Sequence, residues 1–120
     1  MRIFKEFVIE AAHRLPHVPP NHKCGRLHGH SFHIEIHVDG PMNNELGWVV
    51  DFADIKTAFR PIEERIDHHY LNDVQGLENP TSEILARWIW TEIRSALPGI
   101  CRVVVRETCT SGCIYEGEET

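Results

Sequence analysis

Two stretches of alternating side chains, each with a histidine at one end, most constrain what this chain can fold into. Side chains two residues apart share a face of a strand. Residues 29–39 therefore predict a strand with one apolar face, formed by His30, Phe32, Ile34, Ile36 and Val38. Residues 3–13 predict another, whose apolar face carries Ile3, Phe7, Ile9, Ala11 and His13, with Lys5 as an exception. Both strands should bury one face and leave histidines at their ends.

Two amphipathic helices are predicted in the middle of the chain. Asp51 can cap the first, and Pro61 within it should kink or divide it. Its buried positions are Ile55, Phe59, Ile62 and Ile66. The second begins within residues 79–83, capped by either Asn79 or Thr81, and ends at Pro98. Its buried stripe is Leu85, Trp88, Ile89, Ile93 and Ala96.

The remaining pattern completes a single domain over residues 1–120. Residues 14–26 contain three prolines and no periodicity, which predicts a loop. Residues 100–107 predict a third strand, and residues 108–112 a turn into a short last strand. The order is therefore strand, strand, helix, helix, strand, strand, an α+β arrangement.

Composition excludes several classes of protein. A net charge of -6 provides no basic stripe for nucleic acid, and no apolar run approaches the length of a membrane span. The N-terminal residues lack the apolar core and cleavage site of a signal peptide, so we expect a cytoplasmic protein. In that compartment Cys24, Cys101, Cys109 and Cys113 should be reduced thiols.

Three histidines predict a metal site. His28 and His30 share a strand face, and His13 ends the apolar face of the first strand. Three imidazoles without a fourth protein ligand are typical of catalytic zinc, which keeps one position open for water or substrate. Cys24 lies beside them in sequence, near the cationic Lys23. It is either a base next to the metal or the fourth ligand of a closed structural site, and the pattern does not distinguish these roles.

Asp67 and Glu107 are two acidic residues in informative places. Residues 67–69 (DHH) follow the first helix, where the simplest interpretation is that His68 and His69 complement the helix dipole. Glu107 ends a valine-rich strand, on the side of Val103 and Val105. An unpaired carboxylate is costly to bury, so Glu107 should meet an arginine or a ligand. A heterocycle with a parallel N–H and amino group, such as guanine or pterin, would suit it.

The motifs together resemble the 6-pyruvoyltetrahydropterin synthase family over essentially the whole chain. The motifs are residues 7–15 (FVIEAAHRL), 24–32 (CGRLHGHSF), 47–52 (GWVVDF), 71–73 (LND), 78–83 (ENPTSE) and 105–108 (VRET). The spacing from Cys24 to His30 and the stretches 66–73 and 107–113 most resemble the bacterial branch, which forms 6-carboxy-5,6,7,8-tetrahydropterin in queuosine biosynthesis.

The resemblance implies a tunnelling fold, with a four-stranded antiparallel sheet and two helices on one face. It implies a homo-oligomer, commonly a hexamer of two trimers, whose sheets join into a barrel and whose active sites lie between subunits. It further implies zinc as cofactor and 7,8-dihydroneopterin triphosphate as substrate. The implied products are 6-carboxytetrahydropterin, acetaldehyde and triphosphate, with no nucleic-acid or membrane partner.

The resemblance also implies roles for individual residues. It assigns zinc to His13, His28 and His30, and the general base to Cys24. It assigns a proton relay to Asp67 and His68, and pterin anchoring to Glu107 with the backbone near Thr108. Lys23 and Arg26 are candidates for holding the triphosphate. Two alternatives remain open: 6-pyruvoyltetrahydropterin formation from the same substrate, and a non-catalytic structural zinc module. A folate-type relative would be expected to carry glutamate where this chain has Cys24.

Overall fold

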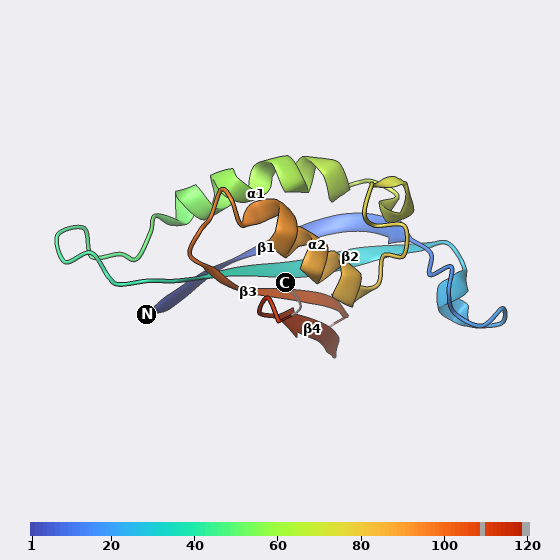
Figure 1. The fold of residues 1–120 in the computed structure, drawn as a ribbon. Coiled ribbons are helices and arrows are strands. Elements are labelled where there is room, and N and C mark those ends of the chain that lie inside the picture. The colour runs from blue at the N-terminus through green and yellow to red at the C-terminus, as the bar shows by residue number, and fades with distance from the viewer. Residues whose placement is uncertain (109, 119–120) are drawn as a thin grey trace.

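The chain folds into an antiparallel sheet with two helices on one face (Figure 1). The computed structural model describes residues 1–108 and 110–118. The strands lie in the order β1 (Arg2–His13), β2 (His28–Asp39), β3 (Ile100–Thr108) and β4 (Ser111–Tyr115). The helices are α1 (Phe52–Ile66) and α2 (Ser82–Ile93), with short 3-10 turns η1 (Lys23–Gly25) and η2 (Leu71–Asp73). The predicted order of elements and α+β class are confirmed.

Strands β1 and β2 form a long hairpin whose register decides where the histidines meet. The pairing runs without interruption from Arg2 opposite Asp39 to His13 opposite His28. The predicted alternation is confirmed, because the inward positions of both strands are buried beneath the helices. The loop after His13 projects beyond the sheet at one end of the molecule, and residues 40–51 project at the other (Figure 1).

Helix α1 follows the sequence prediction except at its proline. The Asp51 carboxylate accepts a hydrogen bond from the Ala53 N–H at 2.9 Å and caps the helix. The four predicted apolar positions are buried against the sheet. Pro61 does not divide the helix, contrary to one form of the prediction. Pro61 lies on the exposed side, where water can satisfy the carbonyl that loses its partner.

Helix α2 begins at the second of its two predicted caps and ends earlier than expected. The Thr81 hydroxyl accepts a hydrogen bond from the Ile84 N–H at 3.1 Å, so Thr81 and not Asn79 is the cap. The prediction that Ala96 is buried is wrong, because α2 ends at Ile93 and Ala96 is exposed. Leu97 fills the core at this end instead.

The C-terminal hairpin is tighter than predicted. Strand β3 continues to Thr108 and β4 begins at Ser111, so the turn is shorter than residues 108–112. The β3–β4 register shifts between Arg106 and Thr108, and Glu107 therefore lies in an irregular part of the ladder. Such an irregularity bends a strand and redirects its side chains.

Two further expectations concern solvent and redox chemistry. Neither helix of the described chain has the length and apolarity needed to cross a membrane. Cys24, Cys101 and Cys113 are free thiols. Cys109 and the side chain of Thr108, both named in the sequence predictions, lie outside the described residues.

Candidate functional site

Three histidines converge at the end of the β1–β2 hairpin. His13 pairs with His28 across the strands, and His30 lies two residues farther along the same face of β2. The ring centroid of His13 is 4.5 Å from that of His28 and 5.2 Å from that of His30. One nitrogen from each ring lies within 4.8 Å of the others. The structure therefore brings together the three histidines that the sequence pattern selected.

Hydrogen bonds to backbone carbonyls fix the tautomer of each ring. The Nδ1 atoms of His13, His28 and His30 lie 2.8, 2.7 and 2.9 Å from the carbonyl oxygens of Pro80, Arg26 and Ser31, respectively. A carbonyl only accepts, so each Nδ1 must donate, and in a neutral ring Nε2 keeps its lone pair. Carbonyls that orient histidines in this way are typical of metal sites.

His13 provides a test of whether a metal fits. Its side chain is 1% exposed, and its Nε2 is buried with no hydrogen-bond partner in the described structure. Burial lowers the pKa of His13, which favours the neutral ring that a metal requires. A cation bound by the three Nε2 atoms would satisfy this nitrogen. The donor set of three imidazoles suits zinc.

Cys24 lies outside this group of nitrogens. It is half-buried in η1, where its N–H donates to Nδ1 of His22 at 3.0 Å and its carbonyl accepts from the Leu15 N–H at 2.9 Å. Among the residues described, the metal-ligating group includes the three histidines and not the Cys24 sulfur. The geometry favours an open three-histidine site over a closed four-ligand site.

Asp67 and His68 form a pair that the helix-dipole interpretation missed. Asp67 is the C-cap of α1, and its carboxylate accepts from the Glu10 N–H at 2.9 Å. That hydrogen bond is the main cause of the lowered pKa of Asp67. The other carboxylate oxygen lies 3.1 Å from Nδ1 of His68, whose backbone has a φ of 59°. His68 is exposed, and it lines the same open depression as His30.

Glu107 faces the histidine cluster. Its carboxylate lies 3.9 Å from Nε2 of His13 and is about one-third exposed, at 31%. In the described structure its neighbour within ion-pair distance is this histidine and not an arginine. The carboxylate is therefore accessible to a ligand placed beside the three histidines.

Sequence reasoning missed a second set of polar contacts around the cysteine turn. Asn72 in η2 bonds to both backbone groups of Arg14, and the Arg14 side chain bonds to the carbonyl of Gly25. His22 caps the turn with its side chain. Arg14 and Asn72 lie within the motifs at residues 7–15 and 71–73. Membership of these motifs is the sequence feature that could have identified them.

Comparisons with known proteins agree with this geometry. The family model described as 6-pyruvoyl tetrahydropterin synthase matches residues 2–118. A 6-carboxy-5,6,7,8-tetrahydropterin synthase from Synechocystis sp. is 46% identical, with 94% of this chain and 91% of the relative aligned. The enzyme of that name from Bacillus subtilis is 32% identical, with 92% and 82% aligned.

Solved structures support the same fold. The 6-pyruvoyl tetrahydropterin synthase of Caenorhabditis elegans superimposes with a TM-score of 0.90 at 23% identity, covering 98% of this chain and 96% of that one. At this identity the likeness concerns the fold. The match of the family model over nearly the whole chain, together with the Synechocystis relative, shows that this chain belongs to the 6-pyruvoyl tetrahydropterin synthase family.

Proposed function

We propose that this chain is a zinc-dependent lyase of 7-deazaguanine and queuosine biosynthesis, acting in the cytoplasm as a single domain over residues 1–120. It converts 7,8-dihydroneopterin triphosphate and one water to 6-carboxy-5,6,7,8-tetrahydropterin, acetaldehyde and triphosphate. The observation that carries the proposal is the cluster of His13, His28 and His30, in which each Nδ1 is bonded to a carbonyl and the buried Nε2 of His13 has no partner in the described structure. The name of the 46% identical relative supports the choice of product.

In this proposal the three histidines hold the zinc ion. When bound, zinc supplies Lewis acidity, which acidifies the hydroxyl groups of the substrate side chain and polarises the adjacent carbonyl. The chain's own contribution is to present three neutral imidazoles. Burial of His13 and the carbonyl partner of each ring serve that purpose.

Proton transfer is assigned to residues on both sides of the cluster. Cys24 removes a proton from the side-chain carbon of the substrate, and His68 donates or accepts on the opposite side. Asp67 holds the His68 ring through a 3.1 Å contact with Nδ1, which orients Nε2 toward solvent or substrate. His68 and His30 border one depression, so a molecule bound at the histidines can reach His68.

Glu107 is assigned to the pterin ring, with the backbone near Thr108. A carboxylate accepts two parallel hydrogen bonds, which matches the N–H and amino group at one edge of a pterin. Glu107 lies beside His13 but keeps part of its surface exposed. It can therefore fix the ring while the side chain of the substrate lies at the histidines.

Product analysis tests this function against the formation of 6-pyruvoyltetrahydropterin. We expect the zinc-loaded protein to release acetaldehyde and triphosphate from 7,8-dihydroneopterin triphosphate in equal amounts. Mass spectrometry of the pterin and an enzymatic assay for acetaldehyde measure this. Triphosphate release with an intact side chain would instead identify the pyruvoyl activity. No turnover, despite full zinc content, would leave the structural zinc module as the better description.

Replacement of Cys24 separates a base from a metal ligand. We expect Cys24→Ala to keep its zinc and its melting temperature and to lose roughly 100- to 10,000-fold in turnover, the usual contribution of a general base. Zinc per subunit, melting temperature and kcat are the measurements. His28→Ala is the control and should lose the metal. Loss of zinc and unfolding in Cys24→Ala would show that Cys24 is a structural ligand.

Replacement of Glu107 tests pterin anchoring. Glu107→Gln keeps the size of the side chain but loses its charge and one acceptor. Loss of a charge-assisted, paired hydrogen bond should weaken pterin binding by about 2 kcal/mol, or roughly thirtyfold. Titration with a substrate analogue measures this, and zinc content should not change. Wild-type affinity and turnover in this variant would mean that the ring is anchored elsewhere.

Assembly is the remaining part of the proposal. Strands β1 and β4 are the edges of the sheet, and Phe4, Val8 and Ile114 are exposed on the face that the helices do not cover. Unpaired edges and exposed apolar side chains are normally covered by a partner. We expect a closed homo-oligomer, hexameric by family resemblance, when size-exclusion chromatography is combined with light scattering. A stable monomer at micromolar concentration would contradict this.

A further inference from the structure

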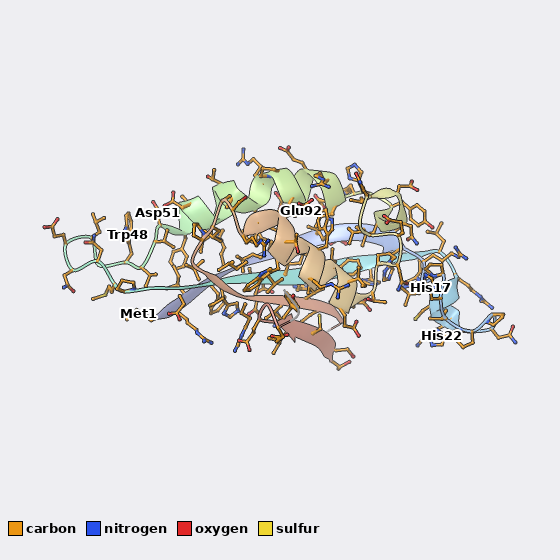
Figure 2. All side chains as sticks on the ribbon, viewed as in Figure 1. Met1, His17, His22, Trp48, Asp51 and Glu92 are labelled. Atoms are coloured by element: carbon orange, nitrogen blue, oxygen red, sulfur yellow. The ribbon has the colours of Figure 1, made fainter. Side chains whose placement is uncertain are left out.

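The turn that carries Cys24 contains no buried residue and is held by several polar contacts. The turn η1 has no buried residue, and its cap His22 lies in the segment that projects beyond the sheet, at the opposite end from Trp48 (Figure 2). The side chain of His22 accepts from the Cys24 N–H at 3.0 Å, and the Leu15 N–H donates to the Cys24 carbonyl at 2.9 Å. Hydrogen bonds therefore fix both backbone groups of Cys24.

Arg14 supplies the contact that reaches the turn from the sheet. Its Nε donates to the carbonyl of Gly25 at 3.0 Å. Arg14 directly follows His13, the buried histidine of the cluster. The backbone of a predicted metal ligand and the backbone of the cysteine turn are thus connected through one side chain.

Asn72 holds the backbone of Arg14 through two hydrogen bonds. Its amide oxygen accepts from the Arg14 N–H at 3.0 Å, and its amide nitrogen donates to the Arg14 carbonyl at 2.7 Å. The same nitrogen lies 3.3 Å from the carbonyl of Glu78. Only an amide side chain of this size both accepts and donates here, because a carboxylate would direct an oxygen at two carbonyl oxygens.

From these contacts we propose that Asn72 and Arg14 are positioning residues that set the place of the Cys24 thiol relative to the three histidines. The inference rests on the proposed function, in which Cys24 is the base. Asn72 holds the backbone of Arg14, and Arg14 holds the carbonyl that follows Cys24 in the chain. This role requires contacts within the chain and no contact with the substrate. Their effect is on the geometry of proton transfer and not on binding.

A positioning role predicts a particular division between kinetic constants. A misplacement of about 1 Å can lower a rate by roughly a hundredfold while the ligand still binds. We therefore expect Arg14→Met and Asn72→Asp to lower kcat roughly tenfold to a hundredfold and to leave KM and zinc content near wild type. Arg14→Lys keeps a donor on a similar stem and should recover most of the loss.

A second readout does not depend on turnover. The alkylation rate of each cysteine by iodoacetamide can be followed by mass spectrometry of its peptide. Freeing the turn should expose the half-buried Cys24, so its rate should rise several-fold in Arg14→Met and Asn72→Asp. Cys113 is the internal reference, because it lies on β4 and burial raises its pKa to about 11. Its rate should not change.

Matched controls use the same exchanges at exposed positions away from the turn. Arg60→Met on α1 and Asn44→Asp in the loop before α1 should match wild type in kcat and in Cys24 alkylation. In the double variant Arg14→Met/Asn72→Asp, the loss of kcat should be no larger than that of the more damaged single variant. Such non-additivity is expected when two residues act in one chain of contacts.

The outcomes distinguish this inference from the proposed function. Wild-type kcat and Cys24 alkylation in both single variants would overturn the inference while leaving the function intact. Equal damage in Arg14→Lys and Arg14→Met, or multiplying effects in the double variant, would also overturn it. Absence of turnover in the wild type would reject the function alone, since the alkylation rates still report whether Arg14 and Asn72 hold the turn. If Arg14→Met does not fold, the nearly isosteric Asn72→Asp carries the test.

Discussion

The register of the β1–β2 hairpin is the constraint on which the rest of the site depends. A shift of one residue would turn every inward side chain of one strand to the opposite face of the sheet. The burial of Phe32 and Ile34 opposite Ile9 and Phe7 makes that shift costly. The same register places His13 opposite His28. Hydrophobic burial in the middle of the hairpin thus fixes where the histidines meet at its end.

The histidine cluster places a destabilising, unpaired nitrogen where a ligand could bind it. A buried nitrogen without a partner destabilises a fold, and Nε2 of His13 is such an atom in the described structure. The other nitrogen of each ring, Nδ1, is bonded to a backbone carbonyl. What remains is a set of lone pairs that only a cation or a donor can satisfy. The unsatisfied nitrogen is therefore evidence for a ligand, because the carbonyls around it show that the surrounding chain can supply partners.

Sequence periodicity predicted what depends on local pattern, including both long strands, both helices and the three histidines. It failed where non-local contacts decide. The Asp67 carboxylate accepts a hydrogen bond from the N–H of Glu10, fifty-seven positions away, and His68 adopts a φ of 59°. Neither the hydrogen bond nor the dihedral angle can be predicted from the order of residues 67–69. Periodicity placed Ala96 on the buried stripe, yet the helix ends before it. Sequence spacing left the role of Cys24 open, because that role depends on how the proline-rich loop places the thiol relative to the histidines.

The histidines and Cys24 are held in place in different ways. The histidines belong to a paired ladder, in which backbone hydrogen bonds and buried neighbours fix each side chain. Cys24 belongs to a turn without a buried residue, so side chains of other segments must supply what packing does not. Arg14 joins the two, since its backbone follows His13 and its side chain holds the carbonyl of Gly25. The place of Cys24 relative to the three histidines therefore depends on Arg14 together with the Leu15 N–H and the His28 ring. Asn72 supports this arrangement by holding both backbone groups of Arg14.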